Sequence, residues 1–334
     1  MIRTRGLTKD FVVSRTRTVH AVRGIDLDVA PGELVAVLGP NGAGKTTTLR
    51  VLTTLVAPTG GTATVAGFDV RADAAQVRRR IGYVGQGNAA GHSQRVGDEL
   101  VAQGVIHGLT RRAARARAGE LLDALDLVDL ADRKVSALSG GQRRRLDVAM
   151  GLVHAPPLLF LDEPSTGLDP QNRANLWQHV LRMRAEHDMT VVLTTHYLDE
   201  ADTVAERVVV VDHGQVIADD TAEALKADLA GDLVVLDAAD PAQVPALVGL
   251  VEQVPSAREV GWDGASVRVR VGDGPRVAAD LVRAADHHDV GVVGVQVQRP
   301  TLDDVFLALT GRSLREEGRT DPAQQTTDAE EAAA

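Results

Sequence analysis

A glycine-rich segment near the amino terminus constrains this chain more than any other feature. Residues Gly39–Thr46 read Gly-Pro-Asn-Gly-Ala-Gly-Lys-Thr and fit the pattern G-x-x-x-x-G-K-[ST]. The apolar run Val35–Leu38 precedes the segment, and the helix-compatible run Thr47–Leu52 follows it. This order predicts a strand, a glycine loop and a helix, which is the context in which the pattern indicates a phosphate-binding loop.

The residue types in this loop suit a nucleoside triphosphate. Glycines let successive backbone N–H groups converge on phosphate oxygens, and the following helix adds positive potential at its N-terminus. Lys45 would reach the β- and γ-phosphates, and Thr46 would ligate Mg²⁺. An ordinary glycine turn before a helix is the alternative. We expect the nucleotide to contact Gly39, Pro40, Asn41, Gly42, Ala43, Gly44, Lys45, Thr46 and Thr47.

A second motif places two carboxylates directly after an apolar run. Leu158–Leu161 is too short and too apolar for a surface helix, and Asp162 and Glu163 follow it. Ligands bind at the carboxyl ends of strands in α/β sheets. Asp162 would hold Mg²⁺ through its water shell, and Glu163 would polarise the water that attacks the γ-phosphorus. A strand that runs into an acidic turn is the alternative, but the phosphate loop favours an α/β P-loop NTPase.

Composition narrows the class further. At ~150 residues per domain, a chain of 334 residues divides into about two domains. The net charge of −10 provides no global positive field, so no nucleic-acid partner is expected. Cysteine is absent, which excludes disulfides, zinc-cysteine sites, iron–sulfur clusters and thiol nucleophiles. The longest uncharged stretch, Val51–Phe68, is broken by proline and glycines, so we expect no membrane-spanning helix.

The apolar runs indicate an ATP-binding α/β core over residues 1–221. Thr190–Thr194 resembles the two runs above, and such short runs are typical of parallel strands buried on both faces. Residues from about 93 to 150 are rich in Ala, Arg and Leu and predict a helical subdomain inserted in the core. Within it, Arg143–Arg145 are expected to form a solvated helix face.

The pattern of predicted strands and helices changes after Thr221. Residues 222–314 read β-α-β-β-α-β, a ferredoxin-like order, which predicts a second, small α/β domain. A last helix is expected to open with a capping box in which Thr301 is the N-cap and Asp304 lies three residues on. Residues 315–334 are rich in Gln, Thr, Asp, Glu and Ala and predict a disordered acidic tail.

Leu138–Gln142, which reads Leu-Ser-Gly-Gly-Gln, narrows the P-loop class to one family. Each motif is weak alone, but six of them in this order resemble the nucleotide-binding domain of ABC transporters across residues 1–220. The six are Gly39–Thr46, Gln86, Leu138–Gln142, Leu158–Glu163, Ser165–Asp169 and His196.

The resemblance implies that two copies face each other head to tail. The triphosphate held by the loop of one copy would then be covered by four residues of the other copy, Ser139, Gly140, Gly141 and Gln142. The serine and the two glycine N–H groups would donate to γ-phosphate oxygens, and a helix starting near Gln142 would add its dipole. Glycine would be needed twice because a side chain would collide with phosphate.

The resemblance also implies roles for four isolated residues. Gln86 resembles the Q-loop glutamine that touches Mg²⁺ or the attacking water, and His196 resembles the switch histidine that contacts the γ-phosphate. Asp169 resembles the D-loop residue that communicates across the dimer, although it can equally be a helix N-cap before Pro170. Phe11 resembles the aromatic residue that stacks on adenine, with packing at the edge of the core as the alternative.

Residues 299–311 resemble the tail signature of drug-export ATPases of the daunorubicin-resistance type. This resemblance implies an ATP-hydrolysing exporter subunit at the cytoplasmic face of the cell membrane. It would power efflux of an amphiphilic drug or natural product through a separate integral membrane permease. A permease helix would rest in a groove near residues 86–101, and residues 222–314 would stabilise or regulate the dimer.

Two other functions fit a phosphate loop. A soluble ABC-type ATPase that acts on ribosomes or nucleic acid usually carries two cassettes, a long coiled coil or a basic tail, and none is visible here. A small-molecule kinase would use the same loop, but Leu138–Gln142 argues against it.

Overall fold

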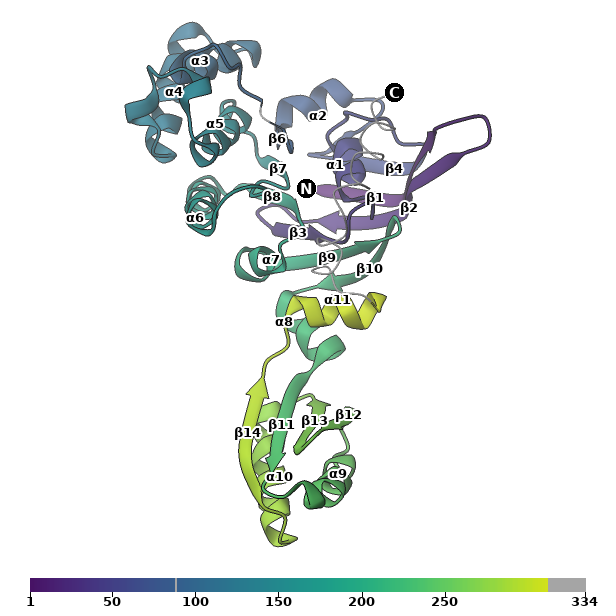
Figure 1. Cartoon of the computed structure of the whole chain (residues 1–334). Helices are drawn as coiled ribbons and strands as arrows, with labels where there is room; N and C mark the ends of the chain where they lie inside the picture. The colour runs from purple at the N-terminus through teal and green to yellow at the C-terminus, as the bar shows by residue number, and fades with distance from the viewer. Residues whose placement is uncertain (88, 312–334) are drawn as a thin grey trace. The chain divides into compact units, whose positions relative to one another are not determined.

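The computed structural model describes residues 1–87 and 89–311, which fall into two compact units (Figure 1). The first unit ends at Asp219 and the second begins at Asp220. The predicted tail, residues 315–334, lies outside the described residues. Among the helices of the described residues, none combines the length and the apolar character that a membrane span requires.

The first unit contains two sheets. Their strands are β1 (Ile2–Val12), β2 (Thr18–Val29), β3 (Leu34–Leu38), β4 (Gly60–Val65), β5 (Phe68–Asp69), β6 (Ile81–Val84), β7 (Leu158–Asp162), β8 (Thr190–Thr195), β9 (Arg207–Asp212) and β10 (Gln215–Asp220). One sheet is antiparallel, with the order β2-β1-β4-β5. The other has the order β10-β9-β3-β8-β7-β6, and the pairings from β9 to β6 are parallel. The predicted α/β fold class is confirmed.

The helices of the first unit flank these sheets. They are α1 (Lys45–Leu52), α2 (Ala74–Arg80), α3 (Val96–Ile106), α4 (Arg111–Ala124), α5 (Gly140–Leu152), α6 (Pro170–His187) and α7 (Leu198–Val204), with short 3₁₀ turns η1 (Val128–Leu130) and η2 (Val135–Ala137). In Figure 1, α3, α4 and α5 lie together as one helical group, and each contacts the other two. These three helices fall within the segment predicted to be helical.

The main core of the first unit surrounds α1. This helix contacts β2 and β4 of the antiparallel sheet and β7 of the parallel sheet. Every residue of β3, β7 and β8 is buried, because these strands are covered on both faces. Strands β3 and β7 flank β8 in the parallel sheet, so their carboxyl ends lie at one edge, which places the glycine loop beside the two carboxylates.

The second unit has the predicted β-α-β-β-α-β order. Its elements are α8 (Ala222–Leu225), η3 (Lys226–Ala230), β11 (Asp232–Ala238), η4 (Pro241–Gln243), α9 (Val244–Glu252), β12 (Arg258–Asp263), β13 (Ser266–Val271), α10 (Gly274–His287), β14 (Val292–Gln298) and α11 (Leu302–Thr310). The sheet order is β12-β13-β11-β14, with antiparallel pairing throughout. Helices α9 and α10 pack on this sheet over a valine- and leucine-rich core (Figure 1). The ferredoxin-like order is confirmed.

The capping box predicted for the last helix is also confirmed. The Thr301 hydroxyl accepts a hydrogen bond from the Asp304 N–H at 3.3 Å, and an Asp304 oxygen accepts one from the Thr301 N–H at 2.9 Å. Arg270 of β13 donates to the other Asp304 oxygen at 2.8 Å, which ties α11 to the sheet of its own unit.

Candidate functional site

The glycine loop lies between the end of β3 and the start of α1, and at two of its glycines the neighbouring backbone leaves no room for a side chain. A Cβ atom on Gly39 would lie 2.1 Å from the carbonyl oxygen of Val211. A Cβ atom on Gly44 would lie 2.3 Å from the carbonyl oxygen of Ala21, and Gly44 has a φ of +101°. Glycine is therefore required at both positions by contacts within the chain, in addition to any requirement of a bound phosphate.

Lys45 is the first residue of α1 and is almost fully buried, at 4% exposure. Its ammonium donates to the carbonyl oxygens of Gly39 at 2.6 Å and Pro40 at 2.9 Å. The side chain thus folds back along the loop, and the loop holds a positive charge at the place where phosphate oxygens are expected.

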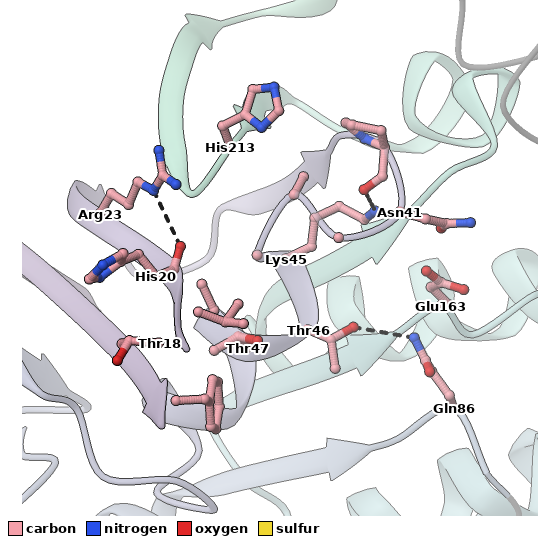
Figure 2. A pocket seen from close by; sticks show the side chains of 17 residues that line it. Thr18, His20, Arg23, Asn41, Lys45, Thr46, Thr47, Gln86, Glu163 and His213 are labelled. Atoms are coloured by element: carbon pink, nitrogen blue, oxygen red, sulfur yellow. Dashed lines mark hydrogen bonds between the residues drawn. The ribbon is translucent and has the colours of Figure 1, made fainter. Parts of the chain in front are cut away.

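A cavity of about 590 Å³ opens over the loop. Figure 2 shows Thr46, Gln86 and Glu163 on one side of Lys45 and His20, Arg23 and His213 on the other. The Gln86 amide donates to the Thr46 hydroxyl at 3.2 Å. The cavity is lined by Phe11, Thr18, Val19, His20, Ala21, Arg23, Pro40, Asn41, Gly42, Ala43, Gly44, Lys45, Thr46, Thr47, Gln86, Glu163 and His213.

Asp162 ends β7 and is fully buried, at 0% exposure. Its carboxylate accepts hydrogen bonds from the Thr46 hydroxyl at 2.9 Å and the Thr194 hydroxyl at 2.7 Å. The Thr46 hydroxyl therefore links the Asp162 carboxylate to the amide nitrogen of Gln86. Mg²⁺ is a hard cation that prefers oxygen ligands, so the donor set predicted from the sequence suits it. Binding of Mg²⁺ by these residues remains a prediction.

Glu163 follows Asp162 in the left-handed backbone region, with φ +47°. One carboxylate oxygen lies 3.4 Å from Nδ1 of His196 and accepts from the Thr166 hydroxyl at 3.3 Å. The hydrogen bond with His196 lowers the pKa of Glu163, against the opposing effect of burial. The carboxylate therefore stays ionised, as a proton acceptor must, and its side chain is still 14% exposed toward the cavity.

The Leu-Ser-Gly-Gly-Gln segment starts a helix. Ser139 is the N-cap of α5, which begins at Gly140, two residues before the position expected from the sequence. The Ser139 hydroxyl accepts from the Gln142 N–H at 3.3 Å, and the Gln142 side chain accepts from the Ser139 N–H at 2.9 Å. A capped serine hydroxyl can still donate its own proton, so donation to a phosphate oxygen stays a prediction.

The two glycines of this segment differ in their surroundings. A Cβ atom on Gly141 would lie 2.4 Å from Oδ1 of Asn172, whereas one on Gly140 would meet nothing within 4 Å. The expectation that phosphate explains both glycines is thus incomplete, since Asn172 already explains Gly141. The Asp169 carboxylate accepts from the Asn172 N–H at 2.9 Å as the N-cap of α6, which confirms the capping interpretation.

The predicted site residues fall into two groups in one chain. Lys45, Thr46, Gln86 and Glu163 share the cavity, whereas Ser139–Gln142 and Asp169 do not line it. Phe11 does line the cavity at 38% exposure, with the Lys9 ammonium 4.8 Å from its ring centroid, and stacking on adenine stays a prediction.

Sequence reasoning missed several residues at the site. Thr18, His20 and Arg23 come from β2, and His213 comes from the turn after β9. No local pattern marks them, because the pairing of β1 with β2 and the approach of β9 to the loop decide their position. Thr194 was also missed. A threonine at the carboxyl end of a buried strand indicates a hydroxyl that can donate a hydrogen bond to a carboxylate on the neighbouring strand, here Asp162.

The expected exposure of Arg144 is wrong. The run Arg143–Arg145 was predicted to be a solvated helix face, but Arg144 is only 8% exposed. It shares one face of α5 with the buried residues Asp147 and Val148, three and four positions on. This spacing is the signal that could have identified it.

The fold and the cavity together define a P-loop nucleoside triphosphatase with an inserted helical group. Comparison with known proteins is more specific. Residues 22–166 match the family described as ABC transporter, and residues 221–310 match the family described as the C-terminal domain of ATP-binding proteins like DrrA1-3. By both matches and by its relatives, the chain belongs to the ATP-binding proteins of ABC transporters, in the daunorubicin-resistance group, and it is an ATPase.

Relatives and a solved structure extend over most of the chain. It is 44% identical to the daunorubicin resistance ATP-binding protein DrrA2 of Streptomyces coeruleorubidus, over 87% of this chain and 91% of that one. It is 41% identical to the daunorubicin/doxorubicin resistance ATP-binding protein DrrA of Streptomyces peucetius, over 97% of this chain and 96% of that one. A dimeric ATP-binding cassette in a post-hydrolysis state, bound to ADP and Pi, matches 66% of this chain and 98% of its own, with 26% identity and a TM-score of 0.61.

Proposed function

We propose that this chain is the ATP-hydrolysing subunit of an exporter that moves an amphiphilic drug or natural product through a separate membrane subunit. The observation that carries the proposal is the extent of the similarity to resistance proteins. It continues through the second unit, since residues 221–310 match the C-terminal domain named for those proteins. A general ATPase would need only the first unit, so the shared second unit supports the specialised function.

The chemistry at the site divides among named residues. The loop N–H groups and Lys45 would bind the triphosphate, while Thr46, Asp162 and Gln86 would hold Mg²⁺, which supplies charge neutralisation for phosphoryl transfer. Glu163 would accept the proton of the attacking water, and His196 would keep that carboxylate ionised and oriented. The 3.4 Å contact between His196 and Glu163 supports these last two roles.

Completion of the site would require a second copy of the chain. Ser139 and Gly140 open α5, away from the cavity of their own chain, and both are exposed. The Ser139 hydroxyl, the Gly140 N–H and the helix dipole are suited to phosphate oxygens. We propose that they close over the nucleotide of an opposing copy in a head-to-tail dimer. The dimeric cassette to which this chain is similar supports that arrangement.

The membrane subunit would dock beside the Q-loop, at the cytoplasmic face of the membrane. A cavity of about 220 Å³ lies there, and its lining includes Leu55, Ala89, His107 and His154. The two histidine rings stack with centroids 4.0 Å apart, and burial lowers the pKa of both, that of His154 to about 4. At neutral pH the two histidines are therefore uncharged, and with Leu55 and Ala89 they suit a partly apolar helix of the partner, while Arg78 and Asp147 supply charges to the same lining.

The first test is Glu163→Gln. If Glu163 is the base, kcat for ATP hydrolysis falls at least about 100-fold while ATP binding is retained, because only proton acceptance is lost. In the presence of ATP, this variant should then accumulate as a dimer. Size-exclusion chromatography with light scattering measures the amount of dimer. Turnover at the wild-type rate would remove Glu163 as the base.

The export role needs a separate measurement. The chain and its membrane subunit, reconstituted in vesicles, should accumulate daunorubicin only with ATP, and the Glu163→Gln complex should not. ATP hydrolysis that proceeds without transport of any amphiphilic compound would contradict the export proposal while leaving the ATPase assignment intact.

A further inference from the structure

Arg144 is a buried cation that the chemistry above does not use. It lies on α5, and its guanidinium reaches across to two strand ends of the parallel sheet. Nε donates to the Pro164 carbonyl at 2.6 Å, and Nη1 donates to the Gly85 carbonyl at 2.7 Å. Nη2 donates to the carbonyls of Asp162 at 3.3 Å and Glu163 at 3.4 Å. All three nitrogens of one side chain therefore bind backbone oxygens.

The four carbonyls belong to the two segments that matter most at the site. Gly85 directly precedes Gln86, and Asp162, Glu163 and Pro164 form the turn that carries the two carboxylates. A buried charge is costly unless it is paired and hydrogen-bonded. Burial lowers the pKa of Arg144, whereas Asp147 and Asp162 raise it, and arginine keeps its proton under such conditions.

The conformation of Glu163 explains why this turn needs support. A non-glycine residue with φ +47° occupies a sparsely populated backbone region, which persists only where the surroundings hold it. On the amide side, the Glu163 N–H donates to the carbonyl oxygen and the hydroxyl of Thr194, both at 3.1 Å. On the carbonyl side, Arg144 binds the residues before, at and after the strained position.

We propose that Arg144 is a positioning residue that locks the Gln86 loop and the Glu163 turn to α5. This rests on the proposed function, in which Glu163 is the base. Because α5 begins at Ser139, movement of that end is transmitted through a rigid helix and a planar guanidinium to both catalytic segments. Contact between Ser139 of one copy and a nucleotide on the other would thereby align Glu163 in its own chain.

Arginine is suited to this role in a way that lysine is not. The guanidinium presents donors in a planar fork, and here the fork spans β6 and β7 at once. A lysine ammonium offers one nitrogen on a flexible stem, so it can keep the charge but not the geometry. The neighbouring Arg145 provides a matched control, since its side chain is also largely buried, at 14% exposure, but lies 4.0 Å from Asp126 instead.

The test compares Arg144→Met, Arg144→Lys and Arg145→Met in the full chain. A misplaced base costs up to about 100-fold in rate, so kcat of Arg144→Met should fall about 10- to 100-fold, with ATP affinity changed less than about threefold. Arg144→Lys should have an intermediate kcat, and Arg145→Met should match wild type. ATP binding and thermal melting of each variant report folding; if Arg144→Met does not fold, Arg144→Lys decides, and a wild-type kcat in it overturns the proposal.

A double-mutant cycle distinguishes positioning from general support. If Arg144 positions Glu163, adding Arg144→Met to Glu163→Gln lowers the residual rate by a smaller factor than it lowers the wild-type rate, and only the effect through the Gln86 loop remains. An equal loss in both backgrounds would overturn the proposal. Full turnover in Glu163→Gln alone would defeat both this inference and the proposed base, whereas a wild-type kcat in folded Arg144→Met would defeat the inference alone.

Discussion

The contact between Glu163 and His196 sets the ionisation of the proposed base. The hydrogen bond favours the charged carboxylate, so the pKa of Glu163 is lower in the folded chain than in the unfolded one. The contact therefore stabilises the fold above the unfolded pKa of Glu163, and this stabilisation is lost as pH falls through the folded pKa. A base with a lowered pKa also remains competent further into the acid range.

We predict that His196→Ala shifts the acid limb of the kcat/KM profile to higher pH. Loss of the imidazole removes the largest cause of the lowered pKa, and the burial that remains raises it. The measurement is the rate of ATP hydrolysis across the acid range, compared with His187→Ala, a histidine at the end of α6. An acid limb that stays in place while the rate drops would show that His196 does not tune Glu163.

At the scale of the element, the two adjacent glycines at the start of α5, Gly140 and Gly141, have different surroundings. Gly141 faces Asn172, whose side-chain amide donates to Asp169 at 2.6 Å. Gly140 faces open space in its own chain. One glycine is therefore needed for packing within the chain, and the other is available to an external ligand.

We predict opposite phenotypes for alanine at these two positions. Gly141→Ala should displace Asn172, break its bond to Asp169 and cost about 1 kcal/mol in free energy of unfolding. Gly140→Ala should leave stability within about 0.5 kcal/mol. It should nevertheless lower ATP hydrolysis and ATP-dependent dimerisation, because its methyl group would face phosphate. Urea denaturation and light scattering measure the two effects; normal dimerisation of Gly140→Ala would contradict the proposed cross-dimer contact.

Elements with a local signature could be predicted from the sequence, and contacts between distant elements could not. The element order predicted for residues 222–314 matches that of the second unit, and the glycine loop predicted the junction of β3 and α1. Asp162 and Glu163 were placed correctly because strand ends of one parallel sheet share an edge. The spacing of Arg144 with Asp147 and Val148 indicates that it is buried, but not which carbonyl oxygens it binds. The places of His20 and Arg23 in the cavity depend on the pairing of β1 with β2, so they have no local pattern.

At the scale of the whole molecule, the chain offers a clean background for testing assembly. It contains no cysteine, so introduced thiols report only on the positions chosen. The residues predicted to bind nucleotide lie on two separate surfaces, the loop cavity and the start of α5.

We predict that Asn41→Cys and Ser139→Cys, combined in the Glu163→Gln chain, become linked between copies by a short bis-maleimide when ATP is present. The proposed head-to-tail arrangement would place the loop of one copy against α5 of the other, whereas the chain with either cysteine alone should give no such product. Gel electrophoresis after denaturation measures the linked dimer. Equal linkage with and without ATP, or none at all, would argue against a nucleotide-sealed interface.

The hydrogen bonds of Lys45 to its own loop have an energetic consequence for every turnover. A triphosphate that attracts the ammonium competes with these two carbonyl oxygens for its protons, so bonds that the loop already makes offset part of the attraction. After cleavage the same carbonyls can take the lysine back as phosphate departs. The loop therefore offers partners to its own cation whenever phosphate is absent, a property that suits an enzyme required to cycle.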